Sequence, residues 1–288
     1  MSVFFITGID AKIGKTFATG YLAKQLMEHG INVITQKLIE TGCEDEISED
    51  ISAHRDLMKI SLQPVDKQYI SCPYVFKAAA PPYLAAELEH VTLYPNRISV
   101  ATQQLKLQYE VVLLETSGGI MTPITDSLST IDYIASQGHP IVLVTAATLE
   151  SINHTLLALQ AIAQRGLPLH AVIYNQFQEE DESFDEIATE EVLQDEKLYD
   201  KKFSYHRVKT ELAEKTRSYL QHYLKQHHPD TFWVELPHIK FTDDATLYQK
   251  MNADKNNMPF YTMEKYAQEI ADNTLYAESL YKRIAKKW

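Results

Sequence analysis

Short apolar runs alternate with longer amphipathic stretches over the first 175 residues of the chain. The runs are rich in β-branched residues and lack the apolar–polar alternation of a half-exposed strand, so they predict strands that are buried on both faces. They cover residues 3–7, 32–36, 111–115, 141–145 and 171–174.

The stretches between these runs have the length and the spacing of amphipathic helices. Gly30, Gly138 and Gly166 each follow one of them, where a left-handed residue commonly ends a helix. Alternating strands and helices predict an α/β fold, namely a doubly wound, mainly parallel sheet with helices on both faces. The expected helices cover residues 15–29, 95–109, 127–137 and 151–165.

The alternation weakens after residue 175. Residues 179–200 contain eleven acidic side chains against one lysine, a pattern typical of a solvated loop or helix face, and we assign it no function. A helix is predicted near 208–226 and a strand at 231–236. The residues from 240 onward are rich in Tyr, Lys and Asn with a mainly helical spacing.

This pattern predicts two parts of the chain. Residues 1–239 form the α/β domain, in which 178–230 is an atypical insertion. Residues 240–288 form a helical extension that packs on the edge of the sheet or on a partner subunit.

Composition excludes several functional classes. The net charge of −12 argues against general nucleic-acid binding. No window approaches the ~20 apolar residues of a membrane span, and residues 1–7 lack the features of a signal peptide. Cys43 and Cys72 give neither a disulfide framework nor a metal cluster. We therefore expect a cytoplasmic protein with no membrane and no nucleic-acid partner.

The segment GIDAKIGKT, residues 8–16, has the features of a phosphate-binding loop. It joins the first strand to the first helix, whose free N–H groups suit a polyphosphate. Gly14 lets the backbone approach the phosphate, Lys15 can reach its β and γ oxygens, and the Thr16 hydroxyl can bind Mg²⁺. Five residues separate Gly8 from Gly14, whereas the usual pattern has four.

Carboxylates follow two of the predicted strands. Glu115 ends the strand 111–115, so it should lie at the carboxyl edge of the sheet beside the phosphate loop, where it can bind Mg²⁺. A second ligand should come from residues 49–56, in which Asp50 and Asp56 both qualify.

Lys37 ends the second strand and is followed by Thr41 and Gly42. A lysine at a buried strand end normally faces an anion. Together with Lys15, it predicts two cations that converge on a transferred phosphoryl group.

These motifs resemble those of dethiobiotin synthetases. That family begins with a G-T-D-x-x-x-G-K-T loop, which has the five-residue gap found here between Gly8 and Gly14. Its K-P-x-x-[ST]-G motif matches Lys37, Thr41 and Gly42, with Leu38 in place of proline. The later matches are Asp50, the E-T-S-G-G of 115–119, the T-P-I-T-D of 122–126, the I-N-H of 152–154, Asn175 and Leu236-Pro237.

The resemblance implies a homodimeric cyclo-ligase that uses ATP and Mg²⁺. It would convert 7,8-diaminononanoate and CO₂ into dethiobiotin through a carbamate that accepts the γ-phosphoryl group of ATP. Lys15 and Lys37 would be catalytic, and Thr16, Asp50 and Glu115 would hold Mg²⁺.

The resemblance also implies the remaining contacts of the site. The tail carboxylate of the diamine would meet a helix N-terminus across the dimer interface. The substrate-binding residues would be Lys37, Thr41, Gly118, Ser151, Ile152 and Asn153. The nucleotide-binding residues would be Asp10, Ala11, Lys12, Ile13, Gly14, Lys15, Thr16, Asn175 and Pro237.

The chain departs from the family pattern at three places. Glu150 stands where the family often has glycine, Ala11-Lys12 replaces Thr-Glu, and Thr116-Ser117 replaces Gly-Ala. A variant substrate is therefore an open alternative to the standard diamine.

Other functional readings compete with the cyclo-ligase. A switch ATPase of the partitioning or nitrogenase-iron-protein type needs a lysine five positions before Lys15, where this chain has Asp10. A cobyrinate-type amidotransferase needs a glutaminase domain with a nucleophilic cysteine. Only Cys43 and Cys72 are available, both within the first third of the chain, so we set this reading aside. A module that only binds nucleotide would function without Lys37.

Overall fold

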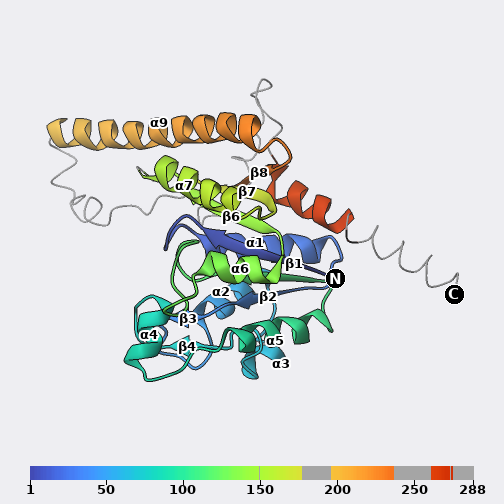
Figure 1. The fold of residues 1–288 in the computed structure, drawn as a ribbon. Coiled ribbons are helices and arrows are strands. Elements are labelled where there is room, and N and C mark those ends of the chain that lie inside the picture. The colour runs from blue at the N-terminus through green and yellow to red at the C-terminus, as the bar shows by residue number, and fades with distance from the viewer. Residues whose placement is uncertain (149, 177–195, 237–260, 273, 275–288) are drawn as a thin grey trace, which may run out of the picture.

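The computed structural model describes residues 1–148, 150–176, 196–236, 261–272 and 274 (Figure 1). Seven strands form one sheet in the order β2-β5-β1-β6-β7-β8-β9, and each neighbouring pair is parallel. The predicted doubly wound parallel sheet is therefore confirmed. The strands are β1 (Ser2–Gly8), β2 (Val33–Lys37), β5 (Val111–Glu115), β6 (Ile141–Ala146), β7 (Leu169–Asn175), β8 (Phe232–Leu236) and β9 (Tyr261–Thr262).

Four of the helices lie close to their predicted positions. They are α1 (Lys15–Glu28), α5 (Pro95–Lys106), α6 (Thr130–Gln137) and α7 (Ser151–Gln164). The prediction started α6 too early, because Ser129 is its N-cap and accepts a hydrogen bond from the Asp132 N–H. The predicted helix 208–226 is part of a longer helix, α9 (Glu196–His227), which lies beside α7 in Figure 1.

Several elements were not predicted. They are the helices α2 (Glu49–Met58), α3 (Pro64–Lys67) and α4 (Pro82–Leu88), and a small parallel sheet of β3 (Glu40–Thr41) and β4 (Val75–Phe76). Helix α2 was not predicted because its buried face includes His54 and Arg55 beside Ile51 and Met58, so its sequence shows no apolar stripe. The others are too short to show a period.

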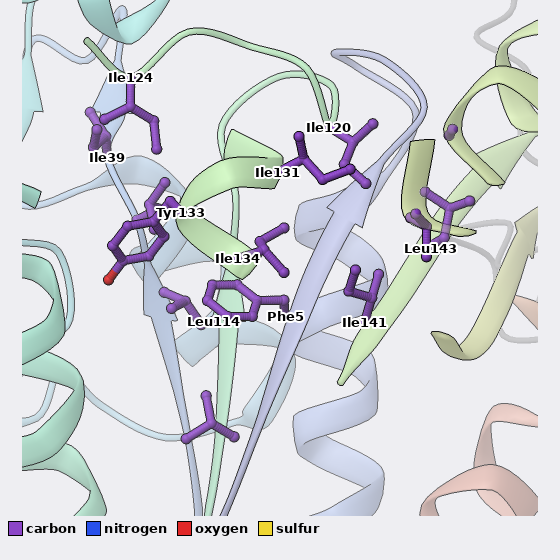
Figure 2. Packing of buried hydrophobic residues seen from close by; sticks show 14 of the residues in the cluster. Phe5, Ile39, Leu114, Ile120, Ile124, Ile131, Tyr133, Ile134, Ile141 and Leu143 are labelled. Atoms are coloured by element: carbon purple, nitrogen blue, oxygen red, sulfur yellow. The ribbon is translucent and has the colours of Figure 1, made fainter. Parts of the chain in front are cut away.

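Alternate residues of each central strand contribute to two different cores. In β1, Phe5 packs into one core and Phe4 and Ile6 into the other. Figure 2 shows Phe5 and Leu114 of the first core against Ile134 of α6. Helices α5, α6, α7 and α9 contribute to this first core, whereas α1 and a helix over 263–272 contribute to the second. This two-sided burial explains why the strands read as continuous apolar runs.

The described part of the C-terminal extension is built into the second core. It begins with β9, which pairs with β8 and which the helical prediction missed. In the helix that follows, Tyr266 is fully buried and its hydroxyl lies 2.8 Å from Nδ1 of His170 on β7. Residues 179–195, Pro237 and most of 240–288 lie outside the described residues, so the boundaries proposed for the two parts stay predictions.

A buried ion pair joins two of the unpredicted helices. Arg55 of α2 donates to the Asp66 carboxylate of α3 at 2.9 and 2.7 Å, and its Nη1 donates to the Thr35 hydroxyl at 2.6 Å. Burial acts to raise the pKa of Asp66, but the hydrogen bonds and charge of Arg55 outweigh it and hold that pKa below its usual value.

We expect Asp66→Asn to lower the free energy of unfolding by about 3 kcal/mol at neutral pH, because it leaves a buried guanidinium without its counter-charge. The stabilisation by an aspartate with a lowered pKa is complete above its unfolded pKa of about 3.9 and disappears as the pH falls through the folded value. Denaturant titrations across this pH range should therefore show that the difference in the free energy of unfolding between Asp66→Asn and the wild type becomes smaller in acid. Asp56→Asn, at an exposed position of α2, the helix that carries Arg55, is the control. Equal losses in the two variants would contradict the role of the pair.

Candidate active site

The phosphate-loop sequence folds as a tight turn between β1 and α1. Gly14 caps α1 with φ 88° and ψ 24°, and Lys12 also has a positive φ of 54°. A Cβ on Gly14 would lie 2.3 Å from Nδ2 of Asn175, so a side chain is excluded there. Successive turns of this kind point backbone N–H groups toward one concavity, which suits an anion.

Gly8, the glycine that stands one position early, makes room for the loop itself. A Cβ on Gly8 would lie 2.6 Å from Cδ1 of Ile13 and 3.0 Å from Cδ of Lys15. The Lys15 side chain passes over Gly8, and its Nζ donates to the Asp10 carbonyl at 2.6 Å. Burial, and then the charge of Lys37, lower the pKa of Lys15 to about 8.

Strand register brings Lys37 and Glu115 together. The two residues are direct partners at the carboxyl ends of β2 and β5, and Nζ of Lys37 lies 2.8 Å from Oε1 of Glu115. The same ammonium also pairs with Oδ2 of Asp50, so it bridges both carboxylates. Burial alone would raise the pKa of Glu115, but the charge of Lys37 and a hydrogen bond from His54 keep it well below its usual value. The prediction that Lys37 faces an anion is confirmed.

The Thr16 hydroxyl lies against the same two carboxylates. Its Oγ1 is 2.8 Å from Oδ1 of Asp50 and 3.3 Å from Oε1 of Glu115. Asp56, the other acidic candidate, is exposed. The structure therefore places Thr16, Asp50 and Glu115 in one cluster beside Lys37, and leaves Asp56 out.

The composition of this cluster fits a magnesium ion. Two carboxylates and a hydroxyl are oxygen donors, and Mg²⁺ bound to a nucleotide takes only one or two carboxylates and completes its coordination with phosphate and water. Among the described residues, no three His, Cys, Asp or Glu side chains form a metal site by themselves. The Lys37 ammonium supplies the positive charge between the carboxylates.

Sequence reasoning missed two buried residues next to this cluster. Nε2 of His54 lies 2.9 Å from Oε2 of Glu115, and both side chains are fully buried. Oε2 of Glu40 accepts from the Ser48 hydroxyl at 2.5 Å and from the Asp50 N–H at 3.3 Å, so it holds the start of α2. The available signal was the spacing of Asp50 and His54, four residues apart, which share one face of a helix.

The turn after β5 approaches the phosphate loop closely. A Cβ on Gly119 would lie 3.1 Å from the carbonyl oxygen of Ile9, and a Cβ on Gly118 would lie 2.5 Å from Oγ1 of Thr122. The Ser117 hydroxyl donates to the carbonyl of Ile39. The Thr116 hydroxyl donates to the Thr7 hydroxyl at 2.9 Å. The Thr116-Ser117 departure therefore adds hydrogen bonds between the strands of the site.

The N-terminus of α7 lies near the same loop, since Nδ1 of His154 is 3.8 Å from Oδ2 of Asp10. Ser151 is fully buried, its hydroxyl lies 2.7 Å from that of Thr148, and its N–H donates to the Thr148 carbonyl. Its side chain is thus used within the fold. The next N–H groups of the helix, those of Ile152 and Asn153, lie ahead of the intrahelical ladder.

The remaining candidates lie around the cluster. Thr41 is half-buried on β3, and Gly42 has a φ of 76°. Asn175 ends β7, and its Nδ2 donates to the Ile13 carbonyl at 2.9 Å, so it supports the phosphate loop. Ala11 and Lys12 are exposed. Pro237 lies outside the described residues.

Comparison with known protein families adds to this geometry. Residues 2–222 match a family described as "AAA domain". The match covers the loop, both lysines and both carboxylates of the cluster.

Two bacterial proteins are similar over much of their length. An "ATP-dependent dethiobiotin synthetase BioD 2" of Haemophilus ducreyi is 43% identical over 229 residues, which cover 80% of this chain and 95% of that protein. A protein of the same name from Pasteurella multocida is 49% identical over 180 residues, which cover 62% of this chain and 84% of that protein.

Among solved structures, a ParA family ATPase from Chlorobium tepidum is 14% identical with a TM-score of 0.40. It covers 65% of this chain and 79% of the other, and a likeness at this level carries no functional argument. Within the described residues, no helix has the length and apolar character needed to cross a membrane.

Proposed function

This chain belongs to the dethiobiotin synthetase family, and from that premise we propose that the phosphate loop and the Lys37–Glu115 cluster carry out its reaction. The chain is an ATP-dependent ligase that forms C–N bonds. The observation that supports the residue roles is the convergence of Thr16, Lys37, Asp50 and Glu115 at the carboxyl edge of the sheet beside Lys15.

The proposed substrates are 7,8-diaminononanoate, CO₂ and ATP. One amine adds to CO₂ and loses a proton, which gives a carbamate. A carbamate oxygen then attacks the γ-phosphorus, and the bond to the bridging oxygen breaks to release ADP. The second amine attacks the carbonyl carbon of the mixed anhydride, phosphate leaves, and the five-membered urea ring closes.

In this reaction the protein mainly supplies position and charge. Lys15 binds the β- and γ-phosphates from the loop, and Lys37 faces the carbamate and the moving phosphoryl group. Phosphoryl transfer depends on alignment and electrostatic stabilisation, so no protein nucleophile is needed.

Thr16, Asp50 and Glu115 would hold the magnesium ion. When bound, the ion neutralises charge on the β- and γ-phosphates. The protein's part is to hold the two carboxylates close together, which their shared contacts with Lys37 and Thr16 favour.

Further contacts complete the proposal. Thr41 and Gly118 would flank the carbamate, Asn175 would contact the base, and Asp10, Ala11, Lys12, Ile13 and Gly14 would surround the phosphates. Pro237, outside the described residues, stays a predicted nucleotide-binding residue. The tail carboxylate binds at the start of α7, where the N–H groups of Ile152 and Asn153 offer a favourable dipole and Ser151 holds the turn. We place this contact in a homodimer, in the cytoplasm.

The test is ATP hydrolysis measured with Mg²⁺, with and without 7,8-diaminononanoate and bicarbonate. We expect the diamine and bicarbonate together to stimulate hydrolysis and to yield dethiobiotin in equal amount to ADP. The methyl ester of the diamine, which lacks the tail charge, should show a raised KM. If the protein is folded and its rate of ATP hydrolysis does not change when the diamine is added, a nucleotide switch would be favoured instead.

A further inference from the structure

Helix α2 carries two residues that contact the carboxylate cluster. One is Asp50, which belongs to the cluster, and the other is His54, the hydrogen-bond partner of Glu115. Asp50 lies in its first turn and reaches the Thr16 hydroxyl at 2.8 Å. His54 lies one turn later and meets Oε2 of Glu115 at 2.9 Å. A single rigid element therefore touches both carboxylates.

The place of α2 is fixed from two sides. At its start, Ser48 caps the Ile51 N–H at 3.1 Å and is itself held by Glu40. Along its length, α2 packs closely on α1, since a Cβ on Gly20 would lie 3.1 Å from Cα of His54. Helix α1 carries Thr16, and α2 carries both Asp50 and the His54 that contacts Glu115. The packing of these two helices therefore fixes the Thr16 hydroxyl relative to both carboxylates.

The contact between His54 and Glu115 gives the two carboxylate oxygens of Glu115 different partners. Glu115 forms an ion pair with the Lys37 ammonium and so acts as an acceptor, which makes Nε2 of His54 the donor. Oε2 is used by this bond, while Oε1 faces Lys37 and Thr16. A carboxylate held on one oxygen cannot rotate freely about its last side-chain bond.

The other nitrogen of this imidazole argues against a role in packing alone. Nδ1 is buried and has no hydrogen-bond partner in the part of the chain that the structure describes. An apolar side chain would fill the same space without leaving such an atom. The bond to Glu115 is the one polar gain that the imidazole provides here.

We propose that His54 is a positioning residue for magnesium: it orients Glu115 so that Oε1 and Asp50 present their oxygens together beside Thr16. This inference rests on the proposed metal-binding role of Thr16, Asp50 and Glu115. A ligand's hydrogen-bonded partner typically contributes 10- to 100-fold to metal affinity.

The experiment compares His54→Gln with His54→Asn. Both carry an amide, but the glutamine N–H₂ can reach the position of Nε2, whereas that of asparagine is too short. Mg²⁺ is titrated calorimetrically into each protein saturated with a non-hydrolysable ATP analogue. We expect Mg²⁺ affinity about 10- to 100-fold weaker in His54→Asn and within about threefold of wild type in His54→Gln. The affinity for the analogue in EDTA should be unchanged in both.

Two results would overturn the proposal. Wild-type Mg²⁺ affinity in a folded His54→Asn protein would reduce His54 to a packing residue, and equal weakening in both variants would show that reach to Glu115 does not matter. Thermal unfolding in EDTA separates lost affinity from lost stability. The Mg²⁺ titration needs no diamine, so its result does not depend on diamine-stimulated hydrolysis. The positioning role of His54 and the proposed cyclo-ligase reaction can therefore be refuted independently.

Discussion

Replacing Lys37 by Met is expected to lower the turnover number for dethiobiotin formation about 10²- to 10³-fold at saturating ATP. Methionine keeps the length and the apolar stem of the side chain but removes the ammonium that we propose to face the transferred group. ATP binding should change little, because the loop lysine, Lys15, is intact. Initial rates of product formation, with the Kd for an ATP analogue measured separately, check both statements.

The same variant should also reveal a second role of the ammonium. Without Lys37, the buried Glu115 and the neighbouring Asp50 face each other with no counter-charge between them. In EDTA, the free energy of unfolding should fall by about 3 kcal/mol, as expected for a broken buried pair. Mg²⁺ with an ATP analogue should restore much of this loss.

Lys24→Met is the matched control, because Lys24 pairs with Glu28 across 3.6 Å on the surface of α1. Its stability should stay within about 0.5 kcal/mol of wild type in either buffer. Normal turnover in Lys37→Met would remove Lys37 from the chemistry.

Replacing Lys15 by Ala is expected to reduce turnover at least about 10³-fold and to weaken ATP binding as well. Lys15 is buried and donates to the Asp10 carbonyl, so its ammonium is already held within the loop that we propose binds the phosphates. Loss of both kcat and nucleotide affinity would distinguish it from Lys37, for which mainly kcat changes.

Lys12→Ala tests whether any loop lysine would do. Lys12 is three residues away in the same loop, but it is exposed. We expect a change in kcat/KM of less than about fivefold, since an exposed charge is screened by solvent and salt. If Lys12→Ala were as damaging as Lys15→Ala, the loop would bind phosphate differently from our proposal.

Much of the fold could be predicted because the sheet is parallel and buried. Strands such as β5, with five consecutive buried residues, read as apolar runs of strand length. Helix α2 could not be predicted in the same way, because its buried face carries Arg55 and His54, whose partners lie far along the chain. Only the tertiary contacts reveal why these polar residues are inside.

The site residues also differ in whether local sequence or only tertiary packing identifies them. Lys15, Thr16, Lys37 and Glu115 stand at strand ends or in a glycine loop, so their local context identifies them. Asp50 could not be chosen over Asp56 from the sequence, since that choice depends on where α2 packs against α1. Glu40 and His54 act through other residues and leave no motif of their own.

The aromatic contacts between the two ends of the chain have a consequence for how the protein is made. The ring of Phe4 lies 5.1 Å from that of His170, and His170 in turn meets Tyr266. Tyr266, Ala267 and Ala271 are fully buried in the core that also holds α1. During synthesis, the first strand therefore emerges long before Tyr266, Ala267 and Ala271, which share its core. Pairings this distant in sequence form late and slowly, so a nascent chain stopped before residue 260 would expose the apolar surface that Tyr266, Ala267 and Ala271 bury.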